Sequence, residues 1–271
     1  MSSLTETFAA ARAEDRAVLI GYLPAGYPTR SEAVAVIAAM IENGVDVVEV
    51  GLPYSDPLMD GPVIQAAVDQ SLAGGARIVD VMSTVRATAA AGAPALVMSY
   101  WNPIEKYGID RFCTELSAAG GCGVITPDLT PEESADWVIA TDESHLDRVY
   151  LVAPSSTDAR LAQVAGMSSG FVYAASTMGV TGVRGTVSDA APRLVERTRG
   201  VTGLPVCVGL GVSTAEQAAE VAAYADGVIV GSAFIRAVQQ APDEAAAREV
   251  VGRLAADLAR GVRRRPSRSA L

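Results

Sequence analysis

Residues 47–61 read VVEVGLPYSDPLMDG, and this stretch guides the interpretation of the whole chain. The apolar run from Val47 to Val50 carries one carboxylate, Glu49, and the glycine- and proline-rich loop after it ends at a second, Asp60. Burying a lone carboxylate costs on the order of several kcal/mol unless it is paired or protonated. We therefore expect Glu49 and Asp60 to be two proton-handling groups facing one small substrate.

Short apolar runs alternate with helical patterns along all 271 residues. Strands are expected at 18–23, 45–50, 95–99, 123–125, 148–152, 171–174, 205–208 and 227–230. Several of these runs are apolar on both faces, as is typical of parallel strands covered by helices. Eight strand–helix units of about 30 residues predict an α/β fold, a single (β/α)8 TIM barrel. The alternative is an open doubly wound sheet, which the lack of a GxGxxG motif after the first strand disfavours.

One domain is expected, because no composition shift or linker divides the chain. The barrel should span 1–262, with an extra N-terminal helix over 5–13 that closes the bottom of the barrel. The basic stretch 263–271 is predicted to be a disordered tail. Segments 29–32, 130–133 and 213–216 have the Ser/Thr-x-x-Glu pattern of a capping box, which predicts that a helix begins at each.

Charge and composition restrict the functional classes. A net charge of −10 argues against nucleic acid as a partner. No apolar run approaches the roughly 20 residues of a membrane helix, and the first residues lack the build of a signal peptide. A cytoplasmic protein with no membrane contact is therefore expected. Three cysteines without CxxC spacing are typical of core residues in a reducing compartment.

Lysine and histidine are almost missing from the sequence. Lys106 is the only lysine and His145 the only histidine. A Schiff-base mechanism would therefore have to use Lys106, and a histidine-rich metal site is excluded. We expect no metal ion.

Barrel geometry assigns a direction to Glu49. Side chains alternate along a strand, so Val47 and Glu49 share one face. The helices outside a barrel require an apolar outer face, so Glu49 should point inward, near the catalytic C-terminal end of its strand. The loop over 52–61 can then bring Asp60 across the barrel mouth.

Each carboxylate also has a structural explanation that needs no catalysis. Glu49 could pair with an arginine inside the barrel, although the expected strands contain only Arg148. Asp60 could cap the helix that follows it, because Asp-Gly-Pro precedes an apolar helical pattern.

A second group of candidates is rich in glycine. Gly179–Gly182, Gly209–Gly211 and Gly231-Ser232 follow three successive expected strands late in the chain. Barrels of this kind build phosphate sites after their last two strands, where backbone N–H groups and a helix N-terminus approach the anion. The pattern predicts a phosphate site there.

The ordered motifs resemble those of the tryptophan synthase alpha subunit family over nearly the whole chain. Besides 49–61, the similar segments are YLPAGYP at 22–28, YWNP at 100–103, PDLTPEE at 127–133 and the three glycine motifs. The resemblance implies retro-aldol cleavage of indole-3-glycerol phosphate to indole and glyceraldehyde 3-phosphate, in L-tryptophan biosynthesis.

The resemblance also implies roles for individual residues. Glu49 would be the general acid/base, which protonates the indole ring carbon, removes the glyceryl hydroxyl proton, or does both in turn. Asp60 would accept the indole N–H and stabilise positive charge on the ring. The implied substrate-binding residues are Tyr22, Tyr100, Tyr173 and Thr181. The implied phosphate-binding residues are Gly182, Gly211, Gly231 and Ser232.

Cofactor and partner follow from the same resemblance. The chain should bind no cofactor, because pyridoxal phosphate belongs to a partner beta subunit that receives indole in an α2β2 complex. Expected contact surfaces for that subunit are 52–59, 100–107 and the loop around 128–131. The alternatives are a stand-alone indole-releasing lyase of specialised metabolism and a catalytically inactive activator of a beta subunit. Met59 and Tyr22 stand where the family often has alanine and phenylalanine, and nothing explains Thr177, where it sometimes has arginine.

Overall fold

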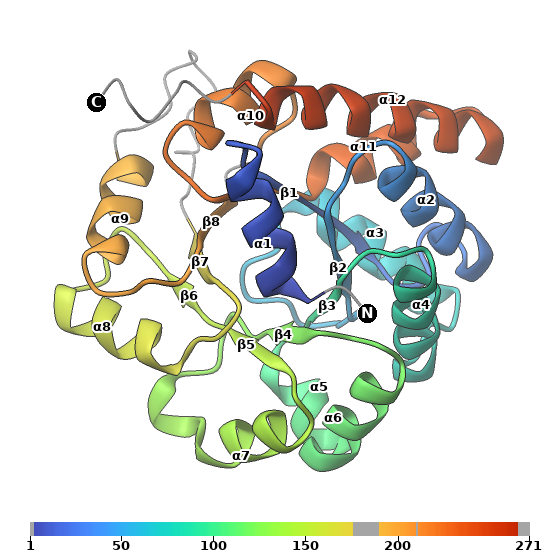
Figure 1. The fold of residues 1–271 in the computed structure, drawn as a ribbon. Helices are drawn as coiled ribbons and strands as arrows, with labels where there is room; N and C mark the ends of the chain where they lie inside the picture. Colours follow the sequence, from blue (N-terminus) through green and yellow to red (C-terminus); the bar gives the residue numbers. More distant parts are fainter. Residues whose placement is uncertain (1–2, 176–189, 210, 265–271) are drawn as a thin grey trace.

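The strands form one parallel sheet that curls into a barrel, seen end-on in Figure 1. The structure, a computed structural model, describes residues 3–175, 190–209 and 211–264. The strands are β1 (Val18–Pro24), β2 (Val47–Gly51), β3 (Ala95–Met98), β4 (Gly123–Ile125), β5 (Asp147–Val149), β6 (Leu151–Val152), β7 (Val172–Ala175), β8 (Val206–Gly209) and β9 (Gly227–Val230). Their order is β5-β4-β3-β2-β1-β9-β8-β7-β6, so neighbours in sequence are neighbours in the sheet.

Strands β5 and β6 are two parts of one barrel strand, interrupted at Tyr150. β5 pairs with β4 and β6 pairs with β7, and the carbonyl of Tyr150 between them accepts a hydrogen bond of 3.1 Å from the N–H of Tyr173. The described strands thus occupy eight positions around the barrel. The predicted (β/α)8 architecture is confirmed, with a shift of at most two residues at any strand end.

Helices surround the barrel on its outer side (Figure 1). They are α2 (Arg30–Glu42), α3 (Pro62–Ala73), α4 (Ile78–Ala90), α5 (Trp101–Tyr107), α6 (Ile109–Ala118), η1 (Pro131–Glu133, a 3-10 turn), α7 (Ala135–Glu143), α8 (Asp158–Met167), α9 (Ala190–Arg199), α10 (Ala215–Ala222), α11 (Ser232–Gln240) and α12 (Glu244–Val262). The main core lies between these helices and the outward side chains of the strands.

Helix α1 (Leu4–Ala13) lies across one end of the barrel, as Figure 1 shows. Its residues Leu4 and Phe8 are buried against inward side chains of the strands, and the rings of Phe8 and Phe171 are 5.9 Å apart. The same interior cluster contains Val47, two residues before Glu49 on β2. The expected N-terminal helix is confirmed, and it leaves the opposite end of the barrel for the chemistry.

The three expected capping boxes were wrong in detail. Thr29 accepts from the N–H of Glu32 at 3.3 Å, but the Glu32 carboxylate binds Arg248 of α12 instead of completing the box. At 130–133 the chain forms η1 and not the start of a long helix. The cap of α10 is Thr214, one residue later than expected. At 29–32 a distant partner thus replaces the local capping contact of Glu32, although α2 still begins directly after Thr29.

The C-terminal part of the barrel ends with α12 at Val262. Arg263 and Arg264 follow, and the rest of the predicted tail, 265–271, lies outside the described residues. No helix in the described ranges is long and apolar enough to cross a membrane.

Candidate active site

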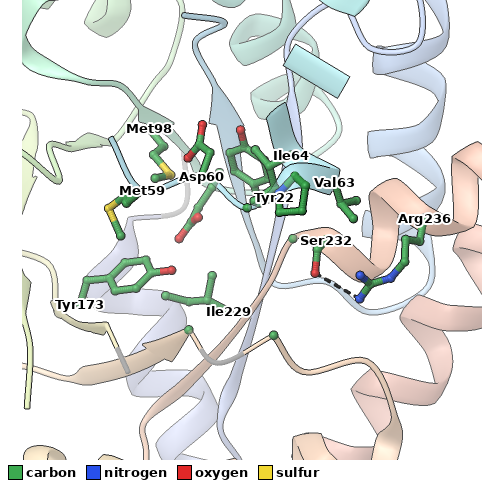
Figure 2. A pocket seen from close by; sticks show the side chains of 16 residues that line it. Tyr22, Met59, Asp60, Val63, Ile64, Met98, Tyr173, Ile229, Ser232 and Arg236 are labelled. Carbon is green, nitrogen blue, oxygen red and sulfur yellow. Dashed lines mark hydrogen bonds between the residues drawn. The ribbon is translucent and has the colours of Figure 1, made fainter. Parts of the chain in front are cut away.

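A cavity of about 380 Å³ opens at the end of the barrel opposite α1, where the strands have their C-terminal ends. We call it the mouth cavity, and Figure 2 shows it from close by. Its lining residues are Tyr22, Glu49, Met59, Asp60, Gly61, Pro62, Val63, Ile64, Met98, Tyr173, Gly209, Gly211, Ile229, Gly231, Ser232 and Arg236. Seven of the ten predicted site residues are among them.

Glu49 is buried in the floor of the mouth cavity. It lies on β2 between Tyr22 of β1 and Leu96 of β3, and only 1% of its surface is exposed. Its Oε1 has no hydrogen-bond partner among the described residues. Burial alone raises the pKa of Glu49 to about 8. At neutral pH this carboxyl therefore carries a proton that it can give away.

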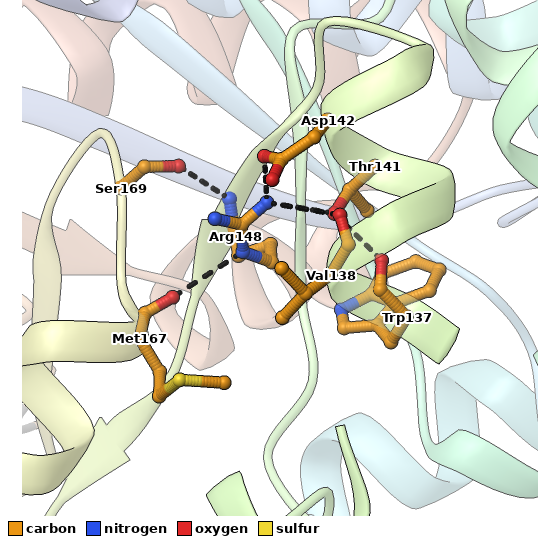
Figure 3. A network of polar contacts seen from close by, with 7 residues as sticks. All are labelled: Trp137, Val138, Thr141, Asp142, Arg148, Met167 and Ser169. Carbon is orange, nitrogen blue, oxygen red and sulfur yellow. Dashed lines mark hydrogen bonds and ion pairs between the residues drawn. The ribbon is translucent and has the colours of Figure 1, made fainter. Parts of the chain in front are cut away.

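The structural explanation for Glu49, pairing with Arg148, fails. Figure 3 shows that Arg148 of β5 binds outward, toward α7 and the end of α8. Its guanidinium donates to Thr141 Oγ1 at 2.9 Å, to the carbonyl of Met167 at 3.3 Å and to the carboxylate of Asp142. Arg148 is thus engaged outside the barrel and does not neutralise Glu49.

Asp60 is held by Tyr100 at the rim of the mouth cavity. The Tyr100 hydroxyl donates to Oδ1 of Asp60 at 3.0 Å and accepts from the N–H of Met59 at 3.1 Å. Burial raises the pKa of Asp60, and the Tyr100 hydrogen bond opposes that rise by stabilising the ionised form. The capping explanation for Asp60 was wrong, since the N-cap of α3 is Gly61 and no side chain caps that helix.

Two tyrosines line the mouth cavity where glycines make room for them. A Cβ built on Gly51 would lie 2.7 Å from the ring of Tyr22, and one on Gly231 would lie 3.2 Å from the same ring. A Cβ on Gly209 would lie 2.9 Å from Cζ of Tyr173. Burial, reinforced by the neighbouring carboxyl groups, raises the pKa of both tyrosines well above its usual value. Both hydroxyls therefore stay neutral at physiological pH.

The other side of the cavity combines glycines with the first turn of α11. Gly211 has φ +71°, a conformation that suits glycine, and Gly231 is the N-cap of α11, where no side chain caps the first turn. Arg236, one turn further along, donates to Ser232 Oγ at 3.3 Å. The structure thus brings Gly211, Gly231 and Ser232 together as predicted, whereas Thr181 and Gly182 lie outside the described residues.

Several lining residues were missed from the sequence. Met98, Val63, Ile64 and Ile229 form apolar walls (Figure 2), and a single apolar residue carries no signal that separates a cavity wall from a core. Arg236 was also missed, although its position four residues after Ser232 places both on one helix face. Tyr100, which the resemblance assigns to substrate binding, is not among the lining residues and hydrogen-bonds Asp60 at the rim of the cavity.

The residues for the other chemistries considered lie away from the mouth cavity. Lys106 is exposed on α5, and His145 is exposed after α7. No group of three or more potential metal ligands gathers in the described ranges. Neither Lys106 nor His145 lines the cavity that holds Glu49 and Asp60.

The barrel and its mouth cavity place the chain in the class of (β/α)8 barrel proteins with a cavity at the C-terminal ends of the strands. Comparison with known proteins gives the particular family. The family model described as tryptophan synthase alpha chain matches residues 8–261. The chain belongs to the tryptophan synthase alpha chain family.

Individual relatives agree with the family match. The tryptophan synthase alpha chain of Thermobifida fusca is 59% identical over 266 residues, which cover 97% of this chain and 98% of that one. Its Streptomyces coelicolor counterpart is 60% identical over 261 residues, with 96% of each chain covered. A structure of Mycobacterium tuberculosis tryptophan synthase superposes with a TM-score of 0.90 at 52% identity, covering 97% of this chain and 99% of that chain. The chain is therefore a lyase of tryptophan biosynthesis that cleaves indole-3-glycerol phosphate.

Proposed function

We propose that Glu49 carries out both proton transfers in the cleavage of indole-3-glycerol phosphate, with Asp60 stabilising the charge that develops between them. The observation that carries this proposal is the burial of Glu49 without a hydrogen-bond partner for Oε1 among the described residues, in the cavity that Asp60 also lines. A carboxyl group in that environment starts the reaction protonated.

A single proton, carried by the carboxyl group of Glu49, is sufficient for the whole reaction. Glu49 first donates its proton to the indole ring carbon that bears the glyceryl chain, which makes the ring cationic. The electrons of the carbon–carbon bond then flow into the cationic ring, and the glyceryl hydroxyl becomes the aldehyde carbonyl. The Glu49 carboxylate takes the proton from that hydroxyl. The products are indole and glyceraldehyde 3-phosphate, and Glu49 is protonated again.

Asp60 acts on the ring nitrogen. As a carboxylate it accepts the indole N–H, and its negative charge lowers the energy of the cationic ring between the two transfers. The hydrogen bond from Tyr100 favours the ionised form of this carboxylate and holds it in position. Tyr22 and Tyr173 supply the walls against which the flat ring packs.

The substrate phosphate binds at the far side of the cavity from the carboxyl groups. Gly211, Gly231 and Ser232 present backbone N–H groups and a hydroxyl there, at the positive end of α11. Gly182 as a fourth phosphate contact, and Thr181 as a substrate contact, rest on the resemblance alone.

The test separates binding from chemistry. Glu49→Gln should bind glycerol 3-phosphate with unchanged affinity and lose at least about 10³-fold in turnover, within the range for removal of a general acid/base. Turnover above a tenth of wild type would refute the role of Glu49. Gly231→Asp places a carboxylate in the phosphate site and should abolish glycerol 3-phosphate binding, so unchanged affinity would refute that site.

The chain forms a complex with the beta subunit of tryptophan synthase, to which it passes indole. Pyridoxal phosphate is expected in that subunit only. The expected contact segments 52–59, 100–107 and 128–131 form a connected surface at the barrel mouth that suits this contact. Tyr54 accepts from Asn102 at 3.1 Å, and Asp128 accepts from the N–H of Trp101 at 2.9 Å. On the loop that carries Tyr54, the adjacent residues Leu58 and Met59 expose 74% and 49% of their surfaces, which offers apolar area to a partner.

Turnover with and without added beta subunit tests the partnership. The rate of indole release should rise when the beta subunit is added. Full activity of the chain alone would favour a stand-alone lyase, and no activity under either condition would favour a non-catalytic activator. Replacing Leu58 by Asp should weaken the stimulation and leave the rate of the chain alone unchanged.

A further inference from the structure

The wall of the mouth cavity contains one arginine, Arg236, that the acid/base chemistry does not use. It lies on the second turn of α11, partly buried, and Figure 2 shows its guanidinium beside Ser232. Among the described residues it is the only cationic side chain that lines the cavity. No carboxylate of the described residues forms an ion pair with it.

The charges in the cavity are arranged in an order that suits a substrate with one anionic end. Glu49 and Asp60 belong to β2 and the loop after it, whereas Arg236 belongs to α11, which follows β9. The one cationic side chain among the described lining residues therefore lies on the α11 side of the cavity, where it attracts an anion. The positive end of α11 points the same way, and no side chain caps its first turn.

The contact between Arg236 and Ser232 also orients the hydroxyl hydrogen of Ser232. Arg236 Nη2 donates to Ser232 Oγ at 3.3 Å and so occupies a lone pair of that oxygen. The hydroxyl proton of Ser232 is then free to point into the cavity, away from the guanidinium. A phosphate oxygen at the start of α11 would accept hydrogen bonds from this hydroxyl and from the backbone N–H groups.

We propose that Arg236 is the cation of the phosphate-binding site, which offsets part of the charge of a phosphate ester dianion and turns the Ser232 hydroxyl toward it. This inference rests on the proposed function, because it deepens the phosphate site at Gly211, Gly231 and Ser232. Arg236 makes that site selective for charged over neutral ligands, a property that backbone N–H groups and a hydroxyl supply only weakly.

A purely structural role for Arg236 would predict a different outcome of its substitution. Arg236 and Ser232 are four residues apart on one helix, so their contact could serve only to stabilise α11. In that case a substitution would lower the stability of the fold and affect all ligands equally. A role in phosphate binding predicts a loss confined to phosphate-bearing ligands.

The experiment measures the binding of two probes to the full-length chain by titration calorimetry. Glycerol 3-phosphate carries the dianion, and indole is neutral and occupies the carboxyl end of the cavity. We compare Arg236→Gln, which removes the charge, with Arg236→Lys, which keeps the charge but loses the planar fork. Arg86→Gln is the matched control, because Arg86 is exposed on α4 and its loss changes the net charge equally.

Arg236→Gln should weaken glycerol 3-phosphate binding by about tenfold or more, as expected for a charge-assisted hydrogen bond. Its indole affinity should equal that of wild type, which also shows that the variant is folded. Arg236→Lys should recover part of the loss, and Arg86→Gln should lose nothing. Added salt should weaken glycerol 3-phosphate binding to wild type more than to Arg236→Gln.

Three results would overturn the inference in distinguishable ways. If wild type and Arg236→Gln bind glycerol 3-phosphate equally, the phosphate site stands and Arg236 has no part in it. An equal loss for indole and glycerol 3-phosphate would assign Arg236 a structural role only. If wild type does not bind glycerol 3-phosphate at all, the proposed phosphate site itself fails, and this inference fails with it.

Discussion

The hydroxyl of Tyr100 joins the carboxylate of Asp60, 3.0 Å away, to the backbone N–H of Met59, 3.1 Å away. One hydroxyl thus fixes both the side chain of Asp60 and the backbone just before it. Because Tyr100 precedes α5 while Asp60 lies on the loop after β2, the bond also ties two loops of the barrel mouth together. We therefore expect Tyr100 to act as a positioning residue for Asp60.

Tyr100→Phe should lower kcat/KM about tenfold at neutral pH, the size expected for one hydrogen bond to a charged group. The hydrogen bond opposes the burial that raises the pKa of Asp60, so its removal should raise that pKa further. The acid limb of the kcat/KM profile should then move to higher pH. Tyr54→Phe is the control, because Tyr54 packs against the Tyr100 ring but hydrogen-bonds only Asn102 among the described residues. An acid limb that does not move in Tyr100→Phe would contradict the positioning role.

The pH dependence of kcat/KM should be bell-shaped. Asp60 must be ionised to stabilise a cationic ring, so activity should rise with pH through its pKa, which burial raises above the usual value. Glu49 must begin protonated, so activity should fall as pH rises through about 8. Rates measured from pH 5 to 10 test both limbs. Activity that keeps rising above pH 9 would mean that Glu49 begins as a base.

Asp60→Asn should lose less activity than Glu49→Gln. The amide oxygen can still accept the indole N–H, but it carries no charge to offset the cationic ring. A loss of about 10²-fold is expected, as for removal of one electrostatic group from a site. The acid limb assigned to Asp60 should disappear from the profile of this variant. If the limb persists unchanged, it belongs to the substrate phosphate, whose second pKa is about 6.

Glu49→Gln should also stabilise the fold at alkaline pH. Burial raises the pKa of Glu49 from 4.5 to about 8, so the folded chain keeps a proton that the unfolded chain releases between these values. Wild-type stability therefore falls as pH rises through this window and levels off above it. The variant cannot ionise, so its advantage in free energy of unfolding should grow by about 2–4 kcal/mol between pH 4.5 and 8.5. Urea titrations of both proteins across this range measure it, and a constant difference would mean that the carboxyl ionises freely.

Gly209→Ala should raise KM with little effect on stability. The added methyl would lie 2.9 Å from Cζ of Tyr173 and push the free end of that ring into the mouth cavity. Gly203→Ala is a matched control, because a Cβ at Gly203 meets nothing within 4 Å. Substrate titrations and thermal unfolding of both variants separate the two effects. A fall in melting temperature without a change in KM would contradict this reading.

The sequence predicts the barrel well because parallel strands covered on both sides appear in it as a simple pattern, namely short apolar runs at regular spacing. Glu49 was predictable for the same reason, since a charge stands out in such a run. The exact caps were not predictable, because Glu32 is taken by Arg248, which is 216 residues away in sequence. Local pattern cannot anticipate a partner so distant.

The candidate site, too, was predictable from the sequence only in part. Asp60 was predictable as a member of the site but not its partner, because the bond to Tyr100 joins residues 40 positions apart. Arg236 was overlooked because arginine on a helix is usually solvated, and only the fold reveals that this helix face borders a cavity. The apolar wall residues Met98 and Ile64 differ in no way from core residues until the cavity is seen.

The glycines beside Tyr22 and Tyr173 limit how this enzyme can change during evolution or engineering. Any substitution of Gly51, Gly209 or Gly231 adds atoms, so mutation there can only narrow the space for substrate. Larger substrates must be accommodated elsewhere, at side chains that can be shortened. Met59, which lines the cavity and is about half exposed at 49%, is the position where space can be gained without disturbing the core.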